Sequence, residues 1–110
     1  MTDTSYLFSS SDYGNVDISN FNLSNVTDMS YTFNSNTSDS IILGNVDTSN
    51  VSDMSYMFQK CAYITDLDLS GLNVNKVANT AYMFNGCTKL TNIDFSGWNT
   101  DSLVNMSYMF

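Results

Sequence analysis

The chain has 110 residues, of which 43% are hydrophobic, which is enough for one globular domain with a modest core. Its 11 acidic residues are all Asp, its basic residues are Lys60, Lys76 and Lys89, and its net charge is -8, which excludes the positive surface that nucleic-acid binding requires. No apolar run approaches the roughly 20 residues that cross a bilayer, and no targeting signal is visible, so we expect no membrane insertion by this chain.

A short phrase recurs along the chain and defines a repeat. Its copies are "SYLF" at 5–8, "VTDMSYTF" at 26–33, "VSDMSYMF" at 51–58, "VANTAYMF" at 77–84 and "VNMSYMF" at 104–110. The final Phe residues of these copies are separated by 25, 25, 26 and 26 positions. The spacing predicts a single repeat domain over 1–110, with a partial repeat at 1–8 followed by repeats at 9–33, 34–58, 59–84 and 85–110.

Between the phrases lies a second recurring block, which we expect to form short strands. In residues 64–70, Leu67 and Leu69 alternate with polar residues, which is typical of a strand with one buried face. The predicted strands are "VDI" at 16–18, "IIL" at 41–43, "LDL" at 67–69 and "IDF" at 93–95.

The phrase itself fits a helical period. Val51, Met54, Met57 and Phe58 lie within an arc of ~120° at about 100° per residue, so a short helical or 3-10 turn would bury them on one side. Tyr56 would then point outward, away from that arc.

A strand and a short helix of this size cannot bury their apolar faces alone, whereas stacked repeats bury a continuous core. We therefore predict a repeat solenoid, a leucine-rich-repeat-like stack of about four coils, each with a short parallel strand and a short helical or 3-10 turn. Strands stack at ~4.8 Å and helices at roughly 8–10 Å, so the strands should lie on a concave side, with slight curvature if the turns are thin.

The unit "MSYMFQKCAYITDLDLSGLNVNKV" at 54–77 resembles the BspA-like leucine-rich repeats of bacterial surface proteins, and more narrowly the repeat of mycoplasma-type surface lipoproteins. The resemblance implies a parallel-stranded solenoid that is located on the cell surface or secreted and takes part in adhesion or in host and matrix contact. The second repeat, "NSNTSDSIIL" at 34–43, departs from this pattern because it lacks the Cys, the following Leu and the Asp of the strand.

Two surfaces are candidate binding sites for a protein or a glycan. The concave strand face would present an acidic, hydroxyl-rich strip suited to a basic peptide or protein, although any strand face that is not buried must be polar. The tyrosine column is either an adhesive, sugar-contacting stripe or a set of rings that shield the neighbouring coils. The candidate residues are Asp17, Asp66, Asp68, Asn92 and Asp94 on the concave face, and Tyr31, Tyr56, Tyr82 and Tyr108 in the column.

Cys61 and Cys87 occupy the same column of adjacent repeats. A disulfide between them is geometrically possible, and the resemblance implies instead a ladder of small buried thiols. The chain has no His that could activate a nucleophile, and its Asp pairs lack the loop geometry of a calcium site, so we expect no catalytic residue, no metal and no cofactor.

The sequence therefore predicts a non-enzymatic surface interaction module. The alternative is a structural spacer or repeat cassette of a larger surface protein, with no ligand of its own. Because the terminal coils would lack polar caps, we also expect self-association through the open ends of the stack.

Overall fold

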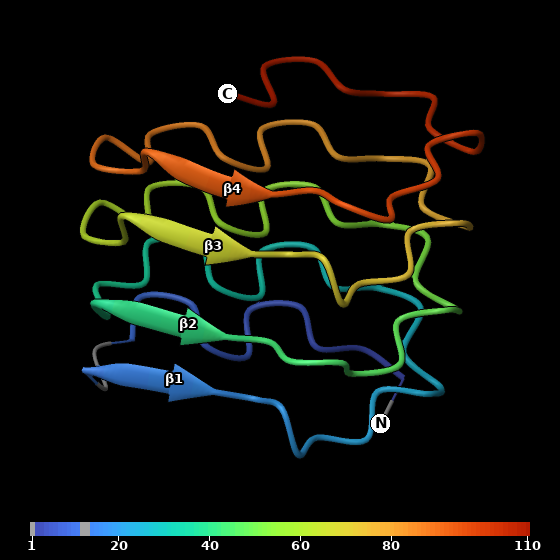
Figure 1. Ribbon diagram of the computed structural model, residues 1–110, viewed down its shortest axis with the longest axis horizontal. Helices are drawn as coiled ribbons and strands as arrows, with labels where there is room; N and C mark the ends of the chain where they lie inside the picture. Colours follow the sequence, from blue (N-terminus) through green and yellow to red (C-terminus); the bar gives the residue numbers. More distant parts are fainter. Residues whose placement is uncertain (1, 12–13) are drawn as a thin grey trace.

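The structure, a computed structural model, describes residues 2–11 and 14–110 and contains four short strands. β1 pairs with β2 and β3 pairs with β4, all in parallel, so the strands form two small two-stranded sheets. The four strands lie one above another in chain order (Figure 1). Their bounds are β1 Asn15–Asp17, β2 Ser40–Ile42, β3 Asp66–Asp68 and β4 Asn92–Asp94.

Each strand begins and ends one residue earlier than predicted. The predicted alternation is confirmed, because Val16, Ile41 and Leu67 are buried while the residues on either side of them are more exposed. The shift has a local cause after β1, where the Oδ1 atom of Asp17 accepts a hydrogen bond of 2.9 Å from the N–H of Ser19. This Asx turn bends the chain directly after the strand and ends the pairing there.

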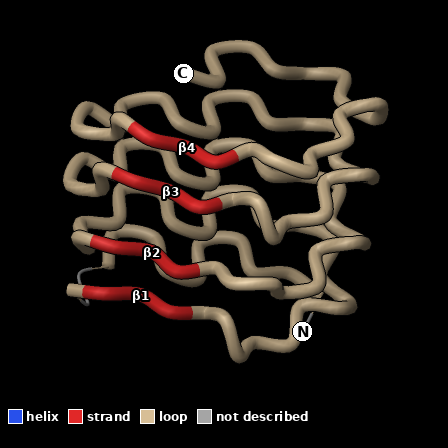
Figure 2. Tube along the Cα trace, in the orientation of Figure 1, coloured by secondary structure: helices blue, strands red, loops and turns tan. Residues whose placement is uncertain are grey.

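The recurring phrase does not form a helix or a 3-10 turn anywhere in the described residues, and this part of the prediction is wrong (Figure 2). The reason is Tyr56 and its equivalents, whose φ angles lie in the left-handed region, at 58° for Tyr56. A helix requires a φ near −60°, so a left-handed residue interrupts it. The phrase instead makes two successive turns, closed by hydrogen bonds from Met57 N–H to the Met54 carbonyl at 3.3 Å and from Gln59 N–H to the Tyr56 carbonyl at 3.2 Å.

Successive copies of the phrase are joined to one another through the backbone. Tyr31 N–H donates to the Ser55 carbonyl at 3.0 Å, and Phe33 N–H donates to the Met57 carbonyl at 2.9 Å. Parallel bridges connect all five copies through Asp3, Asp28, Asp53, Asn79 and Asn105. The strand side and the phrase side of the stack therefore both have strand-like spacing between coils. The predicted concavity depended on thicker helices, which the phrase does not form. We therefore refer below to the strand face rather than to a concave face.

The core lies between these two walls. Val51, Met54, Met57 and Phe58 are fully buried, so the inward-facing set was predicted correctly although the element was not. The ring of Phe58 stacks between those of Phe33 and Phe84, at centroid distances of 5.4 and 5.8 Å. The molecule is compact, with extents of 30 × 28 × 23 Å.

The second repeat, which departs from the pattern at 34–43, keeps its place in the stack. Asn36 stands where the next repeat has Cys61, and both donate to the carbonyl of the Phe one repeat earlier: Asn36 Nδ2 to Phe8 at 3.0 Å and Cys61 Sγ to Phe33 at 3.1 Å. A seam remains on the strand side, because no backbone hydrogen bond among the described residues joins β2 to β3. This seam lies where the repeat length changes from 25 to 26 residues.

Candidate functional site

The strand face consists of the outward side chains of the four strands. The structure brings Asp66, Asp68, Asn92 and Asp94 together, since Asp66 is in register with Asn92 and Asp68 with Asp94. Asp17 lies on β1, and Ile42 of β2 stands in its column between it and Asp68. The residues of the strand face are Asn15, Asp17, Ser40, Ile42, Asp66, Asp68, Asn92 and Asp94.

Each carboxylate of the strand face accepts hydrogen bonds from neighbouring residues. The side chain of Asn92 donates to Asp66 at 2.7 Å and, with a second hydrogen bond from Thr65, lowers the pKa of Asp66. Hydrogen bonds from the side chain and backbone of Ser96 lower the pKa of Asp94 in the same way. Asp68 accepts from the N–H and the Oγ of Ser70 at 3.0 and 2.6 Å. Asp66 and Asp94 are therefore ionised at neutral pH.

Sequence reasoning missed that the Ser residues two positions after each Asp close a turn on the Asp side chain. The pattern Asp-x-Ser at 17–19, 68–70 and 94–96 is the visible signal, because it is typical of Asx turns. In these turns only Oδ1 is engaged, and Oδ2 of Asp17, Asp68 and Asp94 has no hydrogen bond among the described residues. One oxygen of each carboxylate thus remains available to a partner.

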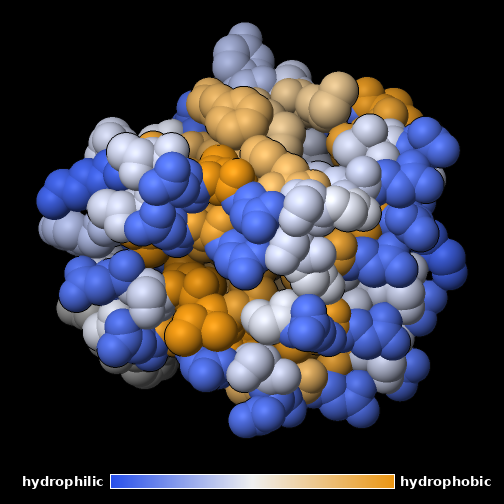
Figure 3. All heavy atoms as spheres, in the orientation of Figure 1, coloured by the Kyte–Doolittle hydropathy of each residue, from blue (hydrophilic) through white to orange (hydrophobic). Residues whose placement is uncertain are grey.

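Two shallow hollows lie side by side on this face and share Asp66 and Asp68. One, of about 380 Å³, also contains Asn92 and Asp94, and the other, of similar volume, is lined by residues 40–44 of the second repeat. The side chain of Ile42 in the second hollow is 48% exposed. Figure 3 shows apolar surface between polar side chains on this side of the molecule.

Two of the three Lys residues have contacts elsewhere. Lys76 Nζ donates to Asn50 Oδ1 at 3.0 Å, and Lys89 Nζ lies 5.3 Å from the centre of the Tyr63 ring. Neither contact involves a carboxylate of the strand face. The negative charge of that face is therefore not balanced by these cations.

The tyrosine column is a continuous stack of rings. Tyr31 lies 4.6 Å from Tyr6 and 4.5 Å from Tyr56, and the stack continues through Tyr82 and Tyr108 at 4.7 and 4.9 Å, with every pair within 17° of parallel. Burial, together with the neighbouring Tyr56 and Tyr6, raises the pKa of Tyr31. Both faces of each internal ring are covered, so only ring edges and hydroxyl groups are offered to a ligand. This geometry favours the packing interpretation of the column.

Cys61 and Cys87 are free thiols, as the resemblance implied. The Sγ atom of each donates to the Phe carbonyl one repeat earlier, for Cys87 to Phe58 at 3.0 Å. Burial raises the pKa of Cys61 to about 12 and that of Cys87 to about 11. Thiols with such pKa values are poor nucleophiles at neutral pH.

Within residues 2–11 and 14–110, no three His, Cys, Asp or Glu side chains gather in a way that would hold a metal ion. The same residues contain no helix long and apolar enough to cross a membrane.

Comparison with curated proteins and with solved structures gave no match. A family model described as "Mycoplasma protein of unknown function, DUF285" matches residues 2–110. The chain therefore belongs to DUF285, a mycoplasma family of unknown function.

Proposed function

We propose that this chain is a non-enzymatic interaction module of a cell-surface or secreted protein, and that its strand face binds a basic segment of a partner protein. The observation that carries the proposal is the row of Asp17, Asp68 and Asp94, each of which keeps one carboxylate oxygen without a hydrogen bond among the described residues. Arg and Lys side chains are the groups that such oxygens bind best in proteins.

The architecture we propose for this module is a leucine-rich-repeat-like solenoid of the BspA type. The support is the parallel order of β1 to β4 and the column of bridges through all five copies of the phrase. Five levels at ~4.8 Å rise by only about 20 Å, so a stack this short has a compact outline.

The chemistry of the strand face suits a chain of alternating basic and aliphatic groups. Exposed ion pairs contribute only about 0.2–1 kcal/mol each, so Asp66, Asp68 and Asp94 would have to act together. The exposed Ile42 beside them offers an apolar surface for the methylene stem of a Lys or Arg. The net charge of -8 would also speed association with a basic partner, and this effect would weaken with salt.

A glycan is the less favoured ligand. Sugar rings bind through the faces of aromatic side chains, and the faces of Tyr31, Tyr56 and Tyr82 are covered by their neighbours in the stack. Hydroxyl and amide groups such as Ser40 and Asn15 would remain for polar contacts, but they already bond to each other at 2.7 Å.

The alternative proposal is a structural spacer with no ligand of its own. In its favour, polar side chains elsewhere in the chain make the same hydrogen bonds within turns, and these stabilise the fold. The Oδ1 atoms of Asp47 and Asp53 accept from the N–H of the Ser two positions later. Under this alternative the strand face is polar only because it is solvated.

The test is binding of the 110-residue chain to an array of host proteins and glycans, beside a variant that carries Asp66→Asn, Asp68→Asn and Asp94→Asn. At positions 68 and 94, Asn keeps the Oδ1 acceptor of the turns and removes the charge. At position 66, Asn removes the charge and keeps one of the two acceptors, which bond to Asn92 and Thr65. We expect a basic protein to bind the wild type and to bind the variant with an affinity that is lower by roughly tenfold or more. A tenfold loss of affinity corresponds to about 1.4 kcal/mol of binding free energy.

The matched control carries Asp28→Asn, Asp47→Asn and Asp53→Asn. It has the same net charge as the first variant, and each of its changes introduces the residue that other repeats already have in that column, for example Asn79 and Asn105 in the column of Asp53. Equal loss in both variants would indicate a general charge effect and contradict a strand-face site. If the wild type bound nothing on the array, the spacer proposal would be favoured.

A further inference from the structure

We infer that the seam between β2 and β3 is the anchor site for one Arg residue of the partner protein. This inference rests on the proposed function, since it names the group that a basic partner inserts into the strand face. It goes further in two respects, because it places that group at one junction of the stack and because it selects Arg over Lys.

One main-chain hydrogen bond recurs where the strands pair. Directly after β1, the N–H of Ile18 donates to the carbonyl of Ile42 at 2.9 Å. Directly after β3, the N–H of Leu69 donates to the carbonyl of Asp94 at 3.0 Å. The two bonds are equivalent by repeat position, and each joins one coil to the next.

The seam lacks this bond. By repeat position it would run from the N–H of Leu43 to the carbonyl of Asp68, and neither group has a hydrogen-bond partner in residues 2–11 and 14–110. Leu43 is only 1% exposed, so its N–H is shielded from bulk water. Buried main-chain groups are nearly always paired with protein or with ordered water. A donor and an acceptor left open at one junction of a regular stack therefore indicate a place where another molecule binds.

The open groups lie at a hollow with two chemically different sides. Residues 40–44 line its β2 side, and Asp66 and Asp68 line its β3 side, around a volume of about 380 Å³. The β2 side offers an aliphatic surface, because the side chain of Ile42 is 48% exposed. On the β3 side, Oδ2 of Asp68 has no hydrogen bond within the described part of the chain. The hollow therefore suits a ligand that is both aliphatic and cationic.

The other two strand junctions do not combine these groups. Asp17 is in register with Ile42 between β1 and β2, but there the carbonyl of Ile42 already accepts from Ile18. Between β3 and β4, Asp68 is in register with Asp94, and no aliphatic side chain stands beside them in that column. Of the three junctions between the described strands, only the seam joins an aliphatic surface, a carboxylate and open main-chain groups.

An Arg residue matches this set. Its methylene stem packs on Ile42, and its guanidinium has five N–H donors in one plane for the carbonyl and the free Oδ2 of Asp68. Its own main-chain carbonyl is an acceptor for the N–H of Leu43. Lys has the same charge on a compact and strongly hydrated ammonium, whereas the guanidinium is more weakly hydrated and loses less on leaving water. The seam therefore favours Arg.

The probe is Nα-acetyl-L-arginine amide, and its matched control is Nα-acetyl-L-lysine amide, which has the same charge and the same main-chain groups. Each compound is titrated into the isotope-labelled 110-residue chain while the amide chemical shifts are followed by NMR. We expect the arginine compound to shift the signal of Leu43 more than those of its equivalents Ile18 and Leu69. We also expect it to bind several-fold more tightly than the lysine compound.

Two variants each alter one side of the hollow. Asp68→Asn removes the charge and keeps the Oδ1 acceptor of the turn. We expect it to lower the affinity for the arginine compound by roughly fivefold. Ile42→Asn removes the aliphatic surface without changing the charge, so it should abolish the preference for the arginine compound over the lysine compound.

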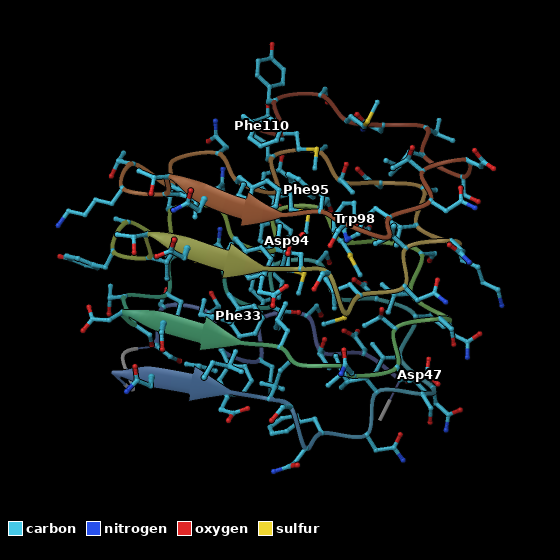
Figure 4. All side chains as sticks on the ribbon, viewed as in Figure 1. Phe33, Asp47, Asp94, Phe95, Trp98 and Phe110 are labelled. Carbon is cyan, nitrogen blue, oxygen red and sulfur yellow. The ribbon has the colours of Figure 1, made fainter. Side chains whose placement is uncertain are left out.

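Asp47→Asn is the control for Asp68→Asn. Asp47 accepts from the N–H and the Oγ of Ser49 at 3.0 and 2.6 Å, the same distances at which Asp68 accepts from Ser70. Asp47 lies in the turns beyond the ends of the strands and outside the hollow (Figure 4). This variant should therefore bind both compounds as the wild type does.

Hydrogen exchange tests the seam itself. Ile18, Leu43 and Leu69 are equivalent by position and at most 2% exposed, so differences in their exchange report hydrogen bonding rather than burial. We expect the N–H of Leu43 to exchange faster than the other two in the free chain, and to slow when the arginine compound saturates the site. Exchange at Leu43 as slow as at its two equivalents overturns the inference. Exchange that the compound does not change also overturns it, because water alone then fills the seam.

Failure of this inference is distinguishable from failure of the proposed function. The seam is not an Arg site if the two compounds bind equally, if Asp68→Asn and Asp47→Asn have the same effect, or if the arginine compound at millimolar concentration leaves the signal of Leu43 unshifted. The proposed function still stands in that case if a basic protein on the array binds the wild type and not the strand-face variant. Absence of such a protein, beside binding of the arginine compound at the seam, would contradict the proposed function alone.

Discussion

The ring of Tyr31 lies 4.5 Å from that of Tyr56 and only 4° from parallel, and both residues have left-handed φ angles, of 59° and 58°. A left-handed conformation costs a bulky residue about 1–3 kcal/mol. A stacked aromatic pair contributes about 0.5–1.5 kcal/mol beyond the area that it buries. Tyr56 stacks on two neighbours, Tyr31 and Tyr82, so the stack offsets the strain of its backbone.

This relationship predicts an unusual order of stability at position 56. Tyr56→Ala removes both ring contacts and keeps the backbone strain, whereas Tyr56→Gly removes the contacts and relieves the strain. We expect both variants to be less stable than the wild type, and the Gly variant to be more stable than the Ala variant by about 1 kcal/mol. Urea unfolding followed by circular dichroism measures the difference.

Tyr63 provides the control, because it is exposed, lies outside the column and does not have a positive φ. There Ala should be at least as stable as Gly, which is the ordinary order. Equal stability of the Gly and Ala variants at position 56 would show that the left-handed angle carries no strain.

Acid should destabilise the fold below about pH 4. Hydrogen bonds from Ser19, Ser49 and Ser96 lower the pKa of Asp17, Asp47 and Asp94 below the ordinary value. A carboxyl group whose pKa is lowered by folding stabilises the fold above its unfolded pKa of about 3.9, and that contribution is lost as the pH falls through the lower folded value. We expect the melting temperature to be nearly constant from about pH 7 to pH 5 and to fall below about pH 4.

The Asp47→Asn variant tests the cause. Asn keeps the acceptor for Ser49 and does not titrate, so the fall of its melting temperature in acid should be shallower than that of the wild type. Protonation also relieves the self-repulsion of a chain with a net charge of -8. A melting temperature that rises between about pH 5 and pH 3 would mean that this relief outweighs the lost hydrogen bonds.

The repeat and its register could be predicted because each coil copies the same buried columns. The spacing of Phe33, Phe58 and Phe84 alone places these rings in one stack. The helix could not be distinguished from two tight turns, since both bury Val51, Met54, Met57 and Phe58. The φ angle of Tyr56 decides between the helix and the two turns, and a Tyr in the sequence does not indicate a left-handed φ.

The candidate site was predicted in part for the same reason. Alternation along a strand places Asp66, Asp68 and Asp94 outward, and the structure has them there. The role of the following Ser70 and Ser96 depends on local hydrogen bonds rather than on periodicity. The seam between β2 and β3 lies where the repeat length changes from 25 to 26 residues, and no pattern in the sequence specifies the effect of that change on pairing.

The two thiols should resist alkylation in the folded protein. With pKa values of about 12 for Cys61 and about 11 for Cys87, a thiolate is rare at about pH 8, where an ordinary thiol is partly ionised. We expect iodoacetamide to label Cys87 slowly and Cys61 more slowly still, since Cys61 is fully buried and Cys87 only partly. Mass spectrometry of the Cys61→Ser and Cys87→Ser variants assigns each rate.

Labelling in about 6 M guanidinium provides the reference, because both thiols then have ordinary pKa values of about 8.5 and should react quickly. If Cys61 reacted in the folded protein as fast as in denaturant, this result would contradict the burial of its thiol in the structure.

Gly71 should not tolerate even a methyl group. A Cβ atom on Gly71 would clash with the carbonyl oxygen of Gly44 and lie 2.6 Å from Asn45 Oδ1, both in the preceding coil. The neighbouring backbone must then move beside the seam, so we expect Gly71→Ala to cost about 1–3 kcal/mol of the free energy of unfolding. Asn20→Ala, in the same column of the first described coil, is the control and should stay within about 0.5 kcal/mol of the wild type. Urea unfolding measures both. If the Gly71→Ala variant were as stable as this control, the second and third coils would approach each other less closely than they do in the structure. The seam would then be open at this end rather than tightly packed.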